Sequence, residues 1–227
     1  MRSAKIWIAF GVNKHFALYS LNDLCDSLGI DIYNSLPMFH SFTGCDNTSS
    51  FLNKGKITVC NTLKIFSDVL SAFKFVRNNP FVHINMESEI FKLLQRFVIL
   101  MYDRNSNLES VNEARRELFC KQGRNLENLP PTEDALLLHS KRAIFQASIW
   151  YIASEENVNL PSPEMFGWKQ DEGVWVPVWT TISAAAEACK ELITCCHKGK
   201  EKRDCTSCKC GKVGLPCTDL CTCLCEK

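Results

Sequence analysis

Residues 5–12 form a nearly continuous apolar run, Lys-Ile-Trp-Ile-Ala-Phe-Gly-Val. Such runs are typical of strands that are covered on both faces in a parallel sheet, so we predict a buried strand here. Ser20 and Asp23 then resemble a capping box, and apolar residues recur at helical spacing up to Gly29. This pattern predicts a short helix over residues 21–28.

The next part of the chain is predicted to be helical with one polar interruption. A helix that begins near Leu36 leads into a loop that contains Gly44, and a second helix extends from about Ile57 to Phe75. The helical period is clearest over residues 86–102, where apolar residues recur at helical spacing with polar residues between them. We expect this amphipathic helix to lie in the core.

Residues 106–188 are predicted to be a helical region rich in tryptophan. A short helix opens at Ser110, a connector occupies residues 124–131, and Thr132 is the predicted N-cap of a long helix. The extended region after it contains three tryptophans that we expect to clasp the long helix: Trp168, Trp175 and Trp179. An alanine-rich helix over residues 183–193 leads into the C-terminal tail. The elements together predict a fold between α/β and mainly α.

Composition and charge narrow the classes of function. The chain has 227 residues with 46% apolar residues, and its formal net charge is only +1. Bulk charge therefore gives no argument for a nucleic-acid partner, and any such partner must bind a local basic patch. The apolar runs are far shorter than the roughly 20 residues of a membrane-spanning helix, so we expect no membrane partner.

The cysteines are concentrated at the C-terminal end of the chain, in residues 189–227. Nine of the 14 lie in close spacing within residues 195–225: Cys195, Cys196, Cys205, Cys208, Cys210, Cys217, Cys221, Cys223 and Cys225. An odd-numbered cluster mixed with lysines favours zinc–thiolate ligation over disulfides, and hence a reducing compartment, the nucleus or the cytoplasm, rather than secretion. About three zinc ions need twelve bonds, which nine thiolates supply only if three of them bridge.

The spacing within the tail resembles the CXC domain of the Tesmin/TSO1 type. The matching pattern is Cys208-x-Cys210, six residues, Cys217, three residues, Cys221-x-Cys223. The adjacent pair Cys195 and Cys196 departs from the family pattern. Related CXC domains bind DNA, so the resemblance implies DNA as a partner. The tail's cations either offset the charge of a thiolate cluster or face DNA phosphates: Lys198, Lys200, Lys202, Arg203, Lys209 and Lys212.

The Gly44-Cys45-Asp46 segment suggests a second kind of chemistry. Asp46 supplies a hard oxygen ligand for a divalent metal, and the loop Lys54-Gly55-Lys56 offers backbone N–H groups and lysines to a phosphate. The alternative is that the Asp46 side chain caps the next helix. Ser49 or Ser50 with a histidine would be a nucleophile pair, but no Gly-x-Ser-x-Gly turn accompanies them, and we interpret His139 as an ordinary packed or surface residue.

The same segment resembles the junction in flap-endonuclease and PIN-like nucleases where a Gly-x-Asp supplies a metal-binding carboxylate. Nearly the whole chain resembles a widespread family of transposon-derived animal proteins, in motifs such as residues 6–11, 36–51, 111–115, 130–132 and 167–169. The resemblance implies that residues 1–105 are the C-terminal portion of a PIN-like domain. In that family an Asp-Thr-Asp strand precedes the Ile-Trp strand, and we expect this chain to start after it.

These observations give one preferred function and two alternatives. We expect a zinc-binding, nucleic-acid-binding protein derived from a PIN-like nuclease and inactive alone, because one aspartate cannot hold two metal ions. Mg²⁺ or Mn²⁺ would bind at Asp46 only in a complete nuclease site. The alternatives are a protein-interaction module with a purely structural zinc tail, and a metal-dependent nuclease completed by missing upstream residues.

Overall fold

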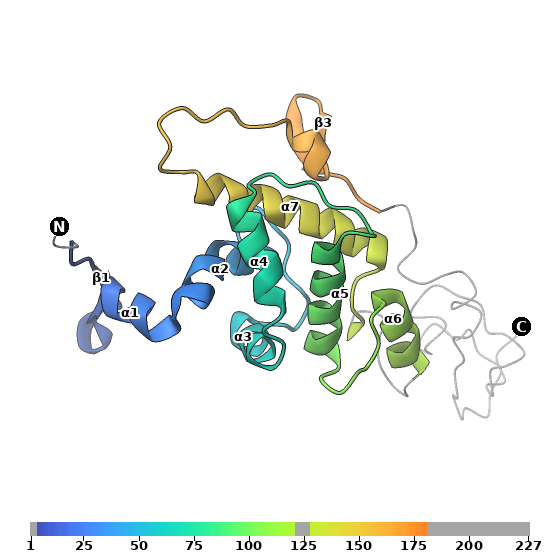
Figure 1. Cartoon of the computed structure of the whole chain (residues 1–227), viewed down its shortest axis with the longest axis horizontal. Helices are drawn as coiled ribbons and strands as arrows, with labels where there is room; N and C mark the ends of the chain where they lie inside the picture. Colours follow the sequence, from blue (N-terminus) through green and yellow to red (C-terminus); the bar gives the residue numbers. More distant parts are fainter. Residues whose placement is uncertain (1–3, 121–127, 181–227) are drawn as a thin grey trace, which may run out of the picture. The chain divides into compact units, whose positions relative to one another are not determined.

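The computed structural model describes residues 4–120 and 128–180, and this part is mainly helical with a few short strands, as expected (Figure 1). Its elements, in chain order, are β1 (Trp7–Phe10), η1 (Asn13–His15), β2 (Ala17–Ser20), α1 (Leu21–Leu28), α2 (Ile30–Phe42), α3 (Lys56–Ile65), α4 (Val69–Asn78), α5 (Glu89–Tyr102), α6 (Val111–Cys120), α7 (Glu133–Tyr151), η3 (Pro163–Phe166), β3 (Trp168–Asp171) and β4 (Val174–Pro177). Residues 1–179 cluster into one compact unit and residues 180–227 into a second.

The first strand differs from the prediction. β1 pairs antiparallel with β2, from Trp7 opposite Ser20 to Phe10 opposite Ala17, and all four residues of β1 are exposed. The prediction of a strand buried in a parallel sheet is therefore wrong. The chain reverses through Gly11 and Asn13, both at positive φ, so the neighbour of β1 is the next strand along the chain. No helix of the described ranges buries this hairpin.

The helix caps confirm the local part of the prediction. The Ser20 side chain accepts a hydrogen bond from the Asp23 backbone N–H at 3.3 Å, and Gly29 ends α1 with φ of 77°. The Thr132 side chain likewise accepts from the Ala135 backbone N–H at 3.3 Å and begins α7. Both caps satisfy N–H groups that have no partner inside the helix.

The core lies between α2, α4, α5 and α7, and α7 packs against all three of the others (Figure 1). The first half of α5 buries one face in this core, and its residues from Phe97 to Tyr102 are all buried, which confirms the predicted core helix. Phe42 at the end of α2 contacts the rings of Phe51, Phe73 and Phe97 at centroid separations of 5.4, 6.4 and 6.4 Å. The loop after α2 is therefore anchored on a buried aromatic cluster of the core.

The predicted helix over residues 57–75 is interrupted. It consists of α3 and α4, separated by a turn at residues 66–68 in which Leu70 N–H donates to the Ser67 carbonyl and Ser71 N–H to that of Asp68. The Ser71 hydroxyl also donates to the Asp68 carbonyl at 2.6 Å. These polar groups stabilise a change of direction that the apolar spacing alone does not reveal.

The tryptophan region folds against α7 through fewer residues than expected. β3 and β4 form an antiparallel hairpin, and Trp168 packs on the core, whereas Trp175 and Trp179 are 40% and 73% exposed. The prediction of a three-tryptophan clasp is therefore right only for Trp168. Arg142 of α7 makes the connection, donating to the carbonyls of Gly167 at 3.2 Å and Val178 at 3.3 Å. The predicted helix at 183–193 lies outside the described residues.

Candidate functional site

The loop between α2 and α3, residues 43–55, is a folded structure that contains Gly44, Cys45 and Asp46. Cys45 and Thr48 exchange backbone hydrogen bonds of 3.1 and 3.3 Å around a tight turn. The Thr48 hydroxyl donates to the Ser41 carbonyl at 2.6 Å, which fixes the turn to the end of α2. Asp46 and Asn47 occupy the tip, where short polar side chains are favoured.

Asp46 is exposed at this tip and is not placed as a helix cap. Gly55 precedes α3, and no side chain caps that helix, so the alternative in which Asp46 caps it is wrong. Among residues 4–120 and 128–180, no group of three or more His, Cys, Asp or Glu side chains is arranged to hold a metal ion. The geometry of a two-metal phosphodiesterase needs several converging carboxylates, and this part of the chain does not supply them around Asp46.

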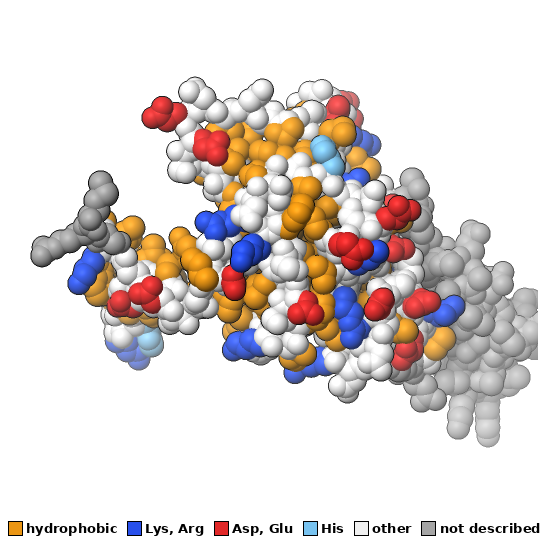
Figure 2. Space-filling view, viewed as in Figure 1, with side chains coloured by type: hydrophobic (Ala, Val, Ile, Leu, Met, Phe, Trp, Pro, Cys, Tyr) orange, Lys and Arg blue, Asp and Glu red, His pale blue; other side chains and the backbone are white. Residues whose placement is uncertain are grey.

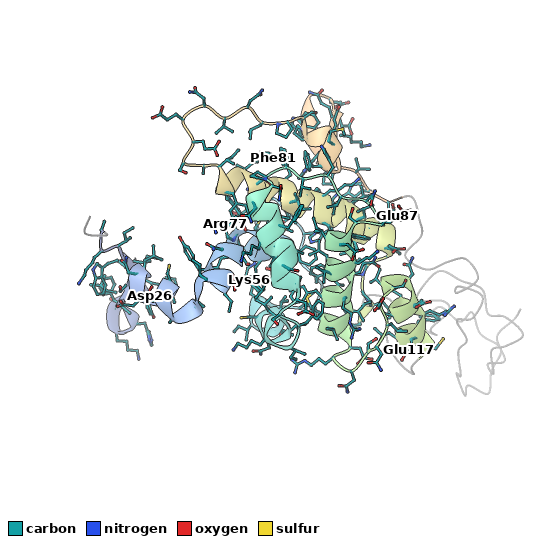
Figure 3. The ribbon with its side chains drawn as sticks, in the orientation of Figure 1. Asp26, Lys56, Arg77, Phe81, Glu87 and Glu117 are labelled. Carbon is teal, nitrogen blue, oxygen red and sulfur yellow. The ribbon has the colours of Figure 1, made fainter. Side chains whose placement is uncertain are left out.

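Lys56 is directed toward the end of α2. Its ammonium group donates to the Gly44 carbonyl at 2.7 Å, to the Thr43 hydroxyl at 2.9 Å and to the His40 carbonyl at 3.4 Å (Figure 3 labels Lys56). A cation is favoured here because the last carbonyls of a helix carry partial negative charge. Partial burial lowers the pKa of Lys56. The lysine thus joins α3 to the C-terminal end of α2.

The rest of the predicted phosphate-binding loop is also engaged within the protein. The ammonium group of Lys54 lies 4.6 Å from the ring centroid of Tyr102, a cation–π contact. The Asn53 amide, at a residue with φ of 58°, donates to the Asn128 side chain at 3.0 Å. Gly55 is the N-cap of α3 with an ordinary extended backbone. The loop therefore connects α3 to α5 and to the segment before α7.

The structure brings Ser49 and His139 together, which the sequence does not predict. Ser49 Oγ lies 3.1 Å from His139 Nδ1, and His139 Nε2 lies 2.8 Å from the Phe42 carbonyl oxygen. A carbonyl can only accept, so Nε2 carries the hydrogen and Nδ1 accepts the hydrogen bond from the serine hydroxyl. This order of groups is similar to that of a serine nucleophile and its histidine base.

The electrostatics of this pair oppose catalysis. Burial lowers the pKa of His139 to about 4, and the positive charge of Arg142 acts in the same direction. A histidine base must become positively charged during the reaction, and a carboxylate behind it normally stabilises that charge. Here a backbone carbonyl takes that place, so the pair is better explained as a connection between α7 and the end of α2.

The cysteines divide between the two units. The described residues contain four free cysteines: Cys25, Cys45, Cys60 and Cys120. The nine predicted zinc ligands and the predicted basic residues of the tail lie outside the described residues. Within the described ranges, no helix is both long and apolar enough to cross a membrane. Comparison with models of protein families, with curated proteins and with solved structures finds no match to this chain.

Proposed function

We propose that the protein is a zinc-dependent nucleic-acid-binding protein in which the tail binds both the metal and the nucleic acid. The observation that carries this proposal is the spacing of nine cysteines in residues 195–225, interleaved with six Lys and Arg residues. Thiolates at such spacing suit tetrahedral zinc sites. The helical unit serves as a scaffold, and Asp46 has no catalytic role.

The contacts of the helical unit support this division of roles. Of the two lysines of the predicted phosphate loop, Lys56 donates to the carbonyl oxygens of His40 in α2 and of Gly44, and Lys54 lies over the ring of Tyr102. Freeing Lys56 for a phosphate would leave the carbonyl of His40, at the end of α2, without this donor. We therefore assign nucleic-acid contact to the tail cations Lys198, Lys200, Lys202, Arg203, Lys209 and Lys212 alone.

Zinc content tests the first half of the proposal. We expect about three zinc ions per full chain purified under reducing conditions and measured by elemental mass spectrometry. The double variant Cys208→Ser/Cys210→Ser should lose at least one ion, because two thiolates of one Cys-x-Cys pair are removed. The matched control is Cys60→Ser/Cys120→Ser, which changes two exposed cysteines of the helical unit and should leave the zinc content unchanged. A zinc-free wild-type protein contradicts the proposal.

The salt dependence of DNA binding tests the second half. We expect the affinity of the zinc-loaded chain for a fluorescent DNA duplex to fall roughly hundredfold from 50 to 200 mM salt, as for about four phosphate contacts. Lys209→Gln/Lys212→Gln should reduce the slope of log affinity against log salt by about 2, since each lost phosphate contact contributes about 1. The double variant Lys64→Gln/Lys74→Gln, on the helical unit, is the matched control and should leave this slope unchanged.

A chain that binds zinc but no DNA would support the alternative of a protein-interaction module. In that case the tail cations offset the negative charge of the thiolate cluster instead of facing phosphates. The two measurements separate the outcomes, because zinc loading is read independently of DNA binding.

A further inference from the structure

The hairpin β1–β2 and helix α1, here called the N-terminal arm (residues 5–28), expose an unusual amount of apolar surface (Figure 2). Nine large apolar side chains of the arm are between 44% and 74% exposed: Ile6, Trp7, Ile8, Phe10, Val12, Phe16, Leu18, Tyr19 and Leu24. Those on the two strands lie on both faces of the hairpin, because neighbouring side chains of a strand point to opposite faces, and Leu24 lies on α1. Asp26, labelled in Figure 3, lies on α1 of the same arm.

The exposed apolar area is on the scale of an interface. Four of the nine side chains are aromatic, with areas of roughly 150–250 Å² each, so at about half exposure these four present on the order of 400 Å², to which the five aliphatic side chains add. Each partner of a standard protein–protein interface contributes about 800 Å², whereas the largest apolar patches of monomeric proteins are typically about 300–600 Å². The arm therefore carries, over its two faces and α1 together, an apolar area comparable with one half of an interface.

The main chain of β1 offers a free edge. Leu21 N–H donates to the Ile6 carbonyl at 2.9 Å, so residue 6 and, by alternation, residues 8 and 10 direct their main-chain groups toward β2. The main-chain groups of Trp7 and Ala9 then face the other edge, where no strand of the described ranges pairs with β1. β1 contains no proline and no charged residue, the features that normally block pairing at an edge.

The geometry points to a second copy of this chain as the occupant of the arm. We propose that β1 pairs antiparallel with β1 of the second copy, which joins the two hairpins into one four-stranded sheet. An antiparallel pair of identical strands has two-fold symmetry, so the same edge and the same apolar side chains complement each other on both chains. The contact buries side chains of both arms and satisfies the free edge of both strands.

A membrane is a less suitable occupant. Hydrocarbon would cover the apolar side chains but would leave the main-chain groups of Trp7 and Ala9 without hydrogen-bond partners, which costs several kcal/mol for each group. α1 also carries Asp23 and Asp26, both exposed. A second copy satisfies the free edge and leaves these carboxylates in water. This proposal does not depend on the proposed function of the tail.

The test measures the molar mass of the full, zinc-loaded chain in reducing buffer, by light scattering coupled to size-exclusion chromatography. The protein concentration is varied from 1 to 100 μM. The reductant prevents disulfides between tails from linking two chains. We expect a dimer that dissociates on dilution. Ala9→Pro removes an N–H at the free edge and is tolerated at an edge, and it should raise the dissociation constant at least hundredfold. Phe10→Lys should have a similar effect by placing a charge in the interface.

The matched control is Ile57→Lys, which puts the same charge on an apolar residue of α3 that is 82% exposed and lies outside the arm. It should dimerise like the wild type, and far-UV circular dichroism should show that all variants keep their helices. The proposal is overturned if the wild type is monomeric at 100 μM, whether or not it binds phosphatidylcholine vesicles. It is also overturned if Ala9→Pro and Phe10→Lys both dimerise like the wild type.

Discussion

Between pH 7 and pH 4, we expect the free energy of unfolding to fall by about 3 kcal/mol through His139 alone. Burial of the imidazole lowers its pKa from 6.5 to about 4 in the folded protein, the Phe42 carbonyl partly opposes this shift, and Arg142 adds to it. The unfolded chain binds a proton below pH 6.5, whereas the folded protein does not until about pH 4. The contribution of His139 to the free energy of unfolding is therefore fully present above pH 6.5, and it is lost as the pH falls toward 4.

Urea unfolding followed by circular dichroism from pH 4 to 7.5 measures this effect. His139→Gln cannot titrate, so the difference in unfolding free energy between wild type and variant should itself change by about 3 kcal/mol over this range. Ser49→Ala is the control for the hydrogen bond, because it removes the partner of Nδ1 but leaves the imidazole buried. It should keep the pH dependence. If the curves of unfolding free energy against pH are parallel for the wild type and His139→Gln, then His139 has the same pKa in the folded and the unfolded protein, which contradicts the prediction.

The local features of the fold could be predicted from the sequence. The caps at Ser20 and Thr132 depend on residues within three positions, and the amphipathic period of α5 depends on its own spacing. Such signals depend only on residues of the same helix and its cap, so they can be recognised without knowing which other elements pack against that helix. The turn between α3 and α4 is not predicted by the apolar spacing, which continues through it, and only the polar groups of Ser67 and Asp68 mark the break.

The features that depend on neighbours could not be predicted. The apolar run at residues 5–12 correctly indicates a strand whose two faces are apolar, but it does not say what covers them. Ser49 and His139 are 90 residues apart in sequence, and they meet only because α7 packs on α2. The Cys-Asp-Asn-Thr sequence was a turn signal that could have placed Asp46 at a tip instead of at a helix start.

Gly44→Ala in the loop between α2 and α3 should be strongly destabilising, and we expect it to cost about 3–4 kcal/mol of stability. Gly44 has φ of 102°, which strains any residue with a side chain, and a Cβ there would lie 2.6 Å from the Ser50 Cβ and 2.7 Å from its Cα. The clash is with the main chain of the loop itself, so it cannot be relieved by a side-chain rotation. Lys56 donates to the Gly44 carbonyl and would lose this partner if the loop moved.

Gly173→Ala is the matched control, because Gly173 also has positive φ, of 83°, but has no atom within 4 Å of the added Cβ. It should cost only about 1 kcal/mol, the backbone strain alone, so the difference between the two variants in urea unfolding measures the clash with Ser50. Equal losses would show that the loop relaxes around the new side chain.

Because the cause is steric, adding Mg²⁺ or Mn²⁺ should not change the difference in unfolding free energy between the two variants. A metal-dependent difference would mean instead that Gly44 serves a metal site at Asp46. Packing against Ser50 thus accounts for the glycine of the Gly-x-Asp pattern without any catalytic metal.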